Sequence, residues 1–334
     1  MKVDVIIPVY MPDRSFFELI EKLETQSVPV NHIIIMNTEE KYFDKLAYEN
    51  RFFEKYLNIK TQHLSKKEFD HGMTRRKGVL KSDADVFVMM TQDAMPEDNM
   101  LIEHLLKALE QENVVCAYAR QLPREDCSEA EKYMRFFNYP PESRVKSIAD
   151  LNELGIKTFF CSNVCCAYKR EIYDKVGGFV KQAIFNEDML YAAKVLKEGY
   201  KIAYVAEARV IHSHNYTCKQ QFQRNFDLGV SQADHPEVFA EVPSEGEGIR
   251  SVKKTIKHLQ KTGNNSKIPY VIMQSACKYI GYRLGKGYQH LPRKLVMKCT
   301  SNKEYWTHAQ RKNDVKNIDV TKGYGKSEAE SGKK

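Results

Sequence analysis

Three short runs of β-branched and other apolar residues constrain the fold of this chain most strongly. They cover residues 3–9, 32–36 and 85–90. Runs this continuous are typical of strands that are buried on both faces of a parallel sheet. Patterns of helical spacing separate them, beginning with the apolar positions between residues 16 and 23. The alternation predicts βαβ units and an α/β fold with a doubly wound sheet.

The composition argues against several classes of protein. Apolar residues make up 42% and charged residues 29% of the 334 positions, a mixture typical of soluble globular proteins. No uncharged apolar run reaches the roughly 18 residues of a membrane-spanning helix. The apolar stretch at residues 5–11 is too short for a signal peptide. The eight cysteines lack CxxC spacing and are expected to be reduced thiols, packed mostly as small hydrophobes.

Charge is distributed unevenly along the chain. Residues 250–334 carry 20 lysines and arginines against 5 acidic residues, whereas residues 1–249 carry 32 against 39. We expect a body over residues 1–235, a basic helical appendage over 236–318 and a disordered tail over 319–334. The basic region could meet nucleic acid, anionic lipid or an anionic substrate, or could only solubilise the chain. Nucleic acid is disfavoured because the sheet-bearing body is acidic.

The ends of the three predicted strands are the places to look for a binding site. In a parallel α/β sheet, ligands bind beyond the carboxyl ends of the strands. The residues at these ends are Pro8, Tyr10, Thr38, Glu39, Gln92 and Asp93. A carboxylate that follows an apolar strand can hold a divalent cation, although Asp93 could equally cap a turn. The sequence lacks GxGxxG and GxxxxGK[ST], so neither a Rossmann dinucleotide site nor a P-loop is predicted.

Three further segments combine residues that could carry chemistry. Residues 70–76 (DHGMTRR) join a glycine turn, a helix start and two arginines, which suits a diphosphate but is also common on helix surfaces. Residues 186–188 (NED) open a helix, either as simple capping or as a general base with a carboxylate neighbour. Residues 212–214 (HSH) end a strand and offer imidazoles to a metal ion, although a surface HxH is usually without function.

The order of these motifs resembles glycosyltransferase family 2, and within it the bacterial rhamnosyltransferases of cell-surface polysaccharide synthesis. The resemblance rests on IIPVY, HGMTRR, TQDAMP, GGF followed by NED, and IHSHNYT, and covers about residues 3–235. It implies a GT-A fold, with a Rossmann-like, mainly parallel sheet flanked by helices. The nucleotide-sugar half would cover about residues 1–120 and the acceptor half residues 121–235.

The resemblance also implies an activity, namely inverting transfer of L-rhamnose from dTDP-L-rhamnose to a hydroxyl of a growing, lipid-linked cell-surface glycan. The alternatives are a family 2 transferase that uses a UDP-hexose, and a non-catalytic scaffold at the membrane periphery. The basic, aromatic stretch between residues 278 and 298 suits an anionic inner leaflet, where a polyprenyl-diphosphate acceptor would lie. A helical face packed on the body explains that stretch equally well. We therefore expect a cytoplasmic protein that contacts the inner face of the plasma membrane peripherally.

Individual roles follow from the same resemblance. The nucleotide-sugar would be bound by Pro8, Tyr10, Thr38, Glu39, His71, Gly72, Arg75, Gln92 and Asp93. Asp188 would be the general base, with Glu187 holding the acceptor or tuning its neighbour. Asp93 would hold Mg²⁺ or Mn²⁺ with His212, and His214 is the less favoured ligand; the family's DxD motif is reduced here to TQD. The acceptor would lie against Phe160, Ser162 and Asn163.

Overall fold

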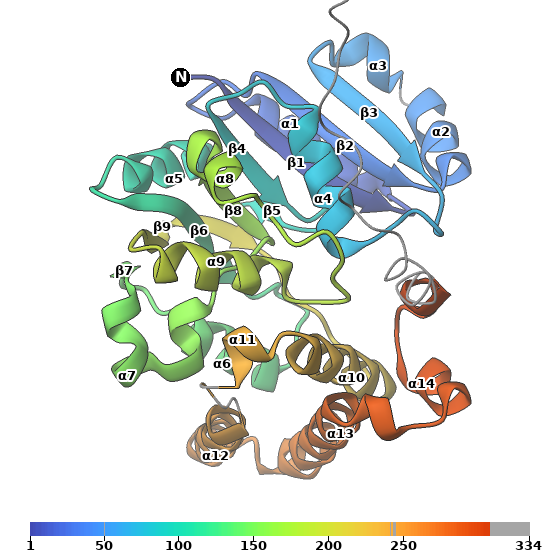
Figure 1. The fold of residues 1–334 in the computed structure, drawn as a ribbon, viewed down its shortest axis with the longest axis vertical. Coiled ribbons are helices and arrows are strands. Elements are labelled where there is room, and N and C mark those ends of the chain that lie inside the picture. Colours follow the sequence, from blue (N-terminus) through green and yellow to red (C-terminus); the bar gives the residue numbers. More distant parts are fainter. Residues whose placement is uncertain (50, 241, 243–244, 308–334) are drawn as a thin grey trace, which may run out of the picture.

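One mixed sheet runs through the part of the chain that the computed structural model describes, residues 1–49, 51–240, 242 and 245–307. Its strand order is β3-β2-β1-β4-β8-β6-β9-β5, and β7 pairs with β9 (Figure 1). The strands are β1 (Val3–Tyr10), β2 (His32–Thr38), β3 (Ile59–Leu64), β4 (Val86–Met90), β5 (Met95–Pro96), β6 (Val114–Leu122), β7 (Arg144–Lys146), β8 (Cys165–Lys169) and β9 (Lys201–Ile211).

The first half of the sheet is parallel, as the three apolar runs predict. β1 pairs in parallel with β2 and β4, and β2 pairs in parallel with β3. Successive residues of β1 face opposite sides, so that Val5 and Ile7 enter one apolar cluster and Ile6 enters the other. Both clusters are closed by helices, which explains why these strands are continuously apolar.

The second half corrects the expectation of a mainly parallel sheet. β8 lies between β4 and β6 and is antiparallel to both. β5 and β7 are antiparallel to β9. β6 and β9, by contrast, pair in parallel. The sequence did not indicate that β8 is antiparallel. Its first four residues are all buried, so it lacks the alternation of apolar and polar residues that is typical of antiparallel strands. The register between β6 and β9 shifts between the pair Ala119–Val205 and the pair Arg120–Arg209.

Helices cover both faces of the sheet. One cluster packs under α1 (Arg14–Glu24), α2 (Glu40–Glu49), α3 (Phe52–Lys55) and α5 (Leu101–Leu109). The other packs under α4 (His71–Leu80), α8 (Arg170–Lys175), α9 (Glu187–Lys197) and α11 (Pro236–Phe239). The segment between β6 and β8 contains α6 (Glu129–Asn138) and α7 (Leu151–Leu154). The cysteines are unpaired, and six of the eight are buried, as predicted.

The C-terminal helices form a separate group at one end of the molecule (Figure 1). They are α10 (Cys218–Asp234), α12 (Glu245–Lys261), α13 (Ile268–Lys286) and α14 (Arg293–Cys299). Glycines bring α10 and α13 together, since a Cβ on Gly285 would collide with the Phe226 carbonyl and one on Gly281 with the Phe222 carbonyl. Among the described residues, no helix is both long and apolar enough to cross a bilayer. The tail expected over 319–334, and the last part of the appendage, lie outside the described residues.

Candidate active site

Asp93 and two histidines converge beyond the end of β4. Asp93 Oδ2 lies 3.5 Å from His212 Nε2 and 3.4 Å from His214 Nε2. The ligand atoms of all three lie within 4.8 Å of one another. Burial alone would raise the pKa of Asp93, but a hydrogen bond and the charge of His212 outweigh it, and the pKa lies well below its ordinary value. Both histidines, the preferred His212 and the alternative His214, therefore face the carboxylate.

Hydrogen bonds behind His212 fix which of its nitrogens faces Asp93. Gln121 Oε1 accepts from Arg135 and lies 3.0 Å from His212 Nδ1, while Gln121 Nε2 donates to Ser162 Oγ at 3.0 Å. In neutral His212 the Nδ1–H would donate to the Gln121 carbonyl, which would leave the Nε2 lone pair free for a cation held beside Asp93. A carboxylate and imidazole lone pairs that converge in this way fit a divalent cation such as Mn²⁺.

Glu187 and Asp188 begin α9 but lie in different surroundings. Asn186, in the left-handed conformation with φ 64°, directs the chain into this helix. Glu187 is buried and forms an ion pair with Arg75 at 3.2 Å. Burial alone would raise the pKa of Glu187, but the charge of Arg75 and a hydrogen bond from Asn163 hold it below its ordinary value. Asp188 is half-buried, and burial and the Glu187 charge raise its pKa to about 8.

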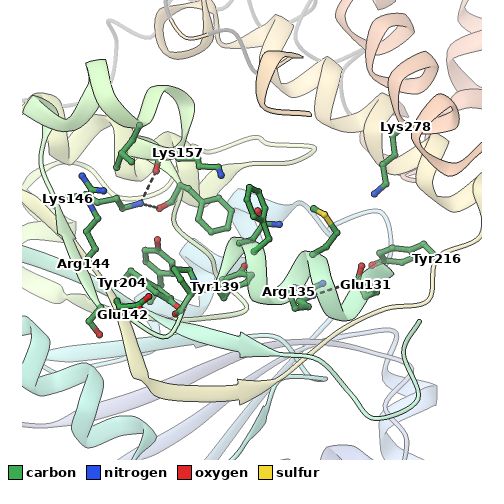
Figure 2. A pocket seen from close by; sticks show the side chains of 18 of the residues that line it. Glu131, Arg135, Tyr139, Glu142, Arg144, Lys146, Lys157, Tyr204, Tyr216 and Lys278 are labelled. Atoms are coloured by element: carbon green, nitrogen blue, oxygen red, sulfur yellow. Dashed lines mark hydrogen bonds and ion pairs between the residues drawn. The ribbon is translucent and has the colours of Figure 1, made fainter. Parts of the chain in front are cut away.

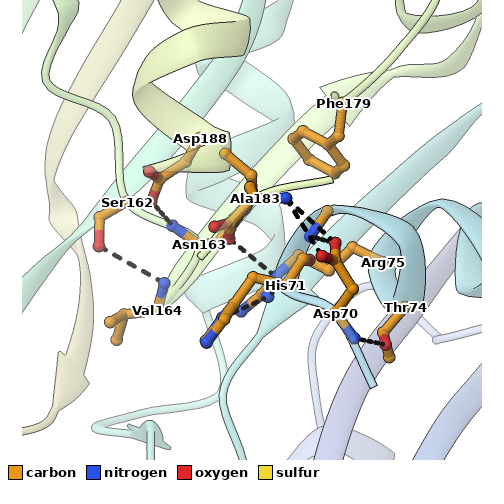
Figure 3. Close-up of polar contacts among 12 residues, drawn as sticks. Asp70, His71, Thr74, Arg75, Ser162, Asn163, Val164, Phe179, Ala183 and Asp188 are labelled. Atoms are coloured by element: carbon orange, nitrogen blue, oxygen red, sulfur yellow. Dashed lines mark hydrogen bonds and ion pairs between the residues drawn. The ribbon is translucent and has the colours of Figure 1, made fainter. Parts of the chain in front are cut away.

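Asn163 holds both carboxylates. Its backbone N–H donates to Asp188 Oδ2 and its side-chain Nδ2 donates to Glu187 Oε1, each at 3.0 Å (Figure 3). Tyr168 donates to Asn163 Oδ1 at 2.7 Å, which orients the amide. Ser162 precedes Asn163 in the chain and bonds to Gln121, so hydrogen bonds on both sides of this peptide link connect the Asp188 region to the Asp93 cluster. Phe160 lies further along the same segment, with its ring 5.8 Å from that of Tyr118.

The start of α4 lies against the Asp188 region, as Figure 3 shows. Asp70 caps the helix by accepting from the N–H groups of Gly72 and Met73, each at 2.9 Å, and it also accepts from the Ala183 N–H. A Cβ on Gly72 would collide with the Val180 carbonyl, so glycine is needed for this close packing. Burial lowers the pKa of His71 to about 4, so its ring is neutral at pH 7. Asp70 was not among the predicted site residues.

The ends of β1, β2 and β4 hold the remaining predicted donor-site residues. The Tyr10 N–H donates to Gln92 Oε1 at 2.7 Å, and Gln92 Nε2 returns a bond to the Tyr10 carbonyl at 3.1 Å. Pro8 is half-buried within β1, and the Tyr10 ring is exposed. Thr38 is buried, and its hydroxyl has no hydrogen-bond partner among the described residues.

Glu39 completes this group. It takes up the left-handed conformation, with φ 66°, and accepts from the Lys66 N–H at 2.9 Å. The Lys66 ammonium lies 5.0 Å from the centre of the Tyr10 ring, so Lys66 contacts the end of β1 through its side chain and Glu39 through its backbone N–H. These strand-end residues lie around the carboxyl edge of the parallel half, where an α/β sheet binds its ligands.

Sequence comparison identifies the family. The model of the family described as "Glycosyl transferase family 2" matches residues 4–177. The O-antigen chain rhamnosyltransferase RfbN of Salmonella typhimurium is 36% identical over 312 residues, which cover 93% of this chain and 98% of the relative. The O-antigen chain rhamnosyltransferase WbaN of Salmonella anatum is 41% identical over 249 residues, covering 74% of this chain and 79% of the relative.

Structural comparison agrees on the fold. A mannosyltransferase of Pyrobaculum calidifontis, solved with GDP-Man and Mn²⁺, superposes with a TM-score of 0.54 at 14% identity, covering 95% of this chain and 88% of that one. GalNAc-T7, solved with UDP, GalNAc and Mn²⁺, superposes with a TM-score of 0.50 at 14% identity, covering 72% of this chain and 51% of that one. The match to the family model and the two relatives at 36% and 41% identity show that the chain belongs to glycosyltransferase family 2.

Proposed function

We propose that this chain transfers L-rhamnose from dTDP-L-rhamnose, with inversion, to a hydroxyl of a growing O-antigen or similar cell-surface glycan. One observation carries the choice of sugar: both relatives at 36% and 41% identity are rhamnosyltransferases of O-antigen chains, and one of them is matched over almost its whole length. This supports rhamnose over a UDP-hexose. Asp93 and Asp188, together with the histidines, form a complete set of groups for such a transfer, which supports an enzyme over a scaffold.

Asp188 is the general base in this proposal. A carboxylate with a pKa of about 8 can take a proton from a hydroxyl near neutral pH more effectively than an ordinary aspartate. Asp188 is half-buried, whereas Glu187 is buried, and its ion pair with Arg75 leaves Glu187 a tuning and positioning role. The acceptor oxygen attacks the anomeric carbon as Asp188 takes the proton, and the bond to the nucleoside diphosphate breaks. A single displacement of this kind inverts the anomeric centre.

The leaving diphosphate needs stabilisation of its negative charge. Asp93, His212 and His214 would hold the divalent cation, which supplies electrostatic stabilisation to the diphosphate when it is bound. On the protein side, Gln121 keeps the His212 lone pair directed toward this position. Gln92 bridges β1 and β4 through its two bonds to Tyr10 and so holds the nucleoside end of the site together.

The acceptor in this proposal is lipid-linked, and α13 supports a contact with the membrane. Four large apolar side chains on one side of this helix are exposed by about half: Ile272, Met273, Tyr279 and Ile280. An amphipathic helix with basic neighbours binds anionic bilayers. Co-sedimentation with anionic vesicles should be lost in an Ile272→Ser, Ile280→Ser double variant. Equal sedimentation of variant and wild type would contradict this contact.

A panel of nucleotide-sugars tests the proposed activity. Release of nucleoside diphosphate is measured with dTDP-L-rhamnose, UDP-glucose and UDP-galactose, with Mn²⁺ or with EDTA, and donor binding is measured in parallel by calorimetry. We expect binding and Mn²⁺-dependent release for dTDP-L-rhamnose. Release from a UDP-hexose in preference to dTDP-L-rhamnose would overturn the sugar assignment and keep the reaction class. Failure of every nucleotide-sugar to bind would overturn both.

A further inference from the structure

A large cavity lies between the catalytic sheet and the C-terminal helices. Its volume is about 690 Å³, within the range of about 300–1,000 Å³ that ligand pockets occupy. The walls come from α6, β7, the segment before Phe160, and α13 (Figure 2). Figure 2 shows Lys278 of α13 pointing into this space from the side opposite Tyr139 and Tyr204. The C-terminal helices therefore complete the cavity that the sheet begins.

The cavity adjoins both halves of the active site. Phe160 lines it and belongs to the segment whose Asn163 holds Asp188. Arg135 lines it as well and donates to Gln121, which orients His212. Tyr216 is a third lining residue, and its ring lies 4.8 Å from that of His214. A molecule in the cavity would thus reach toward the proposed base with one end.

Aromatic rings make up much of the lining. They belong to Tyr118, Phe137, Tyr139, Phe160, Tyr204 and Tyr216. Aromatic faces with a polar edge suit ligands that present both C–H surfaces and hydroxyl groups, as pyranose rings do. This lining is therefore suited to sugar rings.

Most of the cations at the cavity already have partners. Arg135 pairs with Glu131 at 2.8 Å, and Arg144 pairs with Asp150 at 2.8 Å and with Glu153 at 3.0 Å. The Lys157 ammonium contacts Glu247. The buried ammonium of Lys146 donates to the carbonyls of Lys157 and Phe160 at 3.0 and 2.5 Å.

Lys278 differs from these cations. Among the described residues it has neither an ion-pair nor a hydrogen-bond partner, although its side chain is half-buried and directed into the cavity (Figure 2). Burial lowers the pKa of Lys278, with Glu131 acting in the opposite direction. A partly desolvated ammonium without a partner is costly unless an anion satisfies it when the ligand is bound.

We propose that the cavity binds an acceptor that carries an anionic group, and that Lys278 contacts this group while the aromatic walls contact the sugar. The proposal rests on the proposed transfer function and names the chemistry of its acceptor. The anion has two possible sources, the diphosphate of a lipid carrier or the carboxylate of an acidic sugar. Either source gives Lys278 a charge-assisted hydrogen bond that a neutral glycan cannot give.

Binding of three small probes to the full chain tests this assignment without any turnover. The probes are hexyl diphosphate, hexyl glucuronide and the neutral hexyl glucoside, titrated by calorimetry in EDTA so that no cation bridges them to Asp93. We expect one anionic probe to bind about tenfold more tightly than hexyl glucoside, as one charged hydrogen bond allows. Preference for the diphosphate identifies a lipid carrier, and preference for the glucuronide identifies an acidic sugar.

Variants of Lys278 decide whether that preference comes from this residue. Lys278→Gln should abolish the difference between anionic and neutral probes, and Lys278→Arg should restore it. Lys294→Gln removes the same charge from an exposed site on α14 and should leave the preference unchanged. Thermal melts show that each variant is folded. Equal binding of all three probes by the wild type, or an unchanged preference in Lys278→Gln, would overturn the proposal. Because no donor is present, these results are independent of whether the sugar assignment is correct.

Discussion

The region around Asp93 and the region around Asp188 place a carboxylate in opposite electrostatic surroundings. Asp93 faces two histidines, and its pKa is held well below the ordinary value despite burial. Asp188 faces the neighbouring carboxylate of Glu187, and burial and this charge raise its pKa to about 8. Two carboxylates whose environments separate their pKa values in this way are suited to different roles. The first fits a permanently charged ligand for a cation, and the second fits a group that exchanges a proton.

The largest effect is expected where the proton is exchanged. Asp188→Asn should lower turnover about a thousandfold, the typical contribution of a general base. Asp126→Asn, on the exposed segment before α6, serves as a matched control and should retain activity. Steady-state release of nucleoside diphosphate measures both. Retention of more than a tenth of wild-type turnover in Asp188→Asn would contradict the role of this residue.

The same substitution should have the opposite effect on stability. Asp188 binds its proton more tightly in the folded chain, where its pKa is about 8, than in the unfolded chain, where it is about 4. The folded state therefore loses stability as the pH rises from about 4 to about 8. Asparagine carries no such penalty, so Asp188→Asn should melt at a higher temperature than the wild type at pH 8. At pH 4 the difference should largely vanish; a variant that melts lower at pH 8 would contradict the raised pKa.

A smaller effect is expected at the other carboxylate, and on a different quantity. Asp93→Asn should weaken Mn²⁺ binding about a hundredfold, because the ligand loses its charge. Asp188→Asn should leave Mn²⁺ affinity unchanged, since Asp188 lies outside the cluster of Asp93, His212 and His214. Titration followed by electron paramagnetic resonance measures both affinities. Equal losses in the two variants would break the distinction between the two regions.

The hydrogen bonds that join the regions should have the mildest effect. Gln121→Leu removes the acceptor that orients His212 and the donor to Ser162, with similar side-chain volume. Outer partners of metal ligands typically contribute about tenfold to affinity. We therefore expect Mn²⁺ binding to weaken about tenfold, again measured by titration. An unchanged affinity would show that His212 is held in place without Gln121.

The parallel half was predictable from the sequence because its signals are local. β1, β2 and β4 are continuous apolar runs, and residues 186–188 (NED), which were expected to open a helix, begin α9. The candidate residues at the strand ends follow from where a parallel sheet binds ligands. Its place after an apolar strand made Asp93 a candidate beside the alternative of a turn cap, and the resemblance in motif order suggested the roles of Asp93 and Asp188.

Other features depend on partners that are distant in the sequence and gave no local signal. Gln121 lies near the end of β6, and its role exists only because Arg135, Ser162 and His212 surround it. The glycines of α13 look like helix-weakening residues until α10 is placed against them. Lys278 was read as one basic residue in an amphipathic stretch, and only the packing of α13 directs it into the cavity.

The pH dependence of kcat/KM, measured for the wild type and for Glu187→Gln, tests the central claim most directly. Because the base must be deprotonated, wild-type activity should rise with pH and level off above about pH 8. Glu187→Gln removes a negative charge beside Asp188, so the midpoint of its profile should move to lower pH. Circular dichroism would check that the variant still folds after Arg75 has lost its ion-pair partner. A flat profile between about pH 6 and 9, or the same midpoint in both proteins, would contradict the assignment of Asp188 as the base that its neighbour tunes.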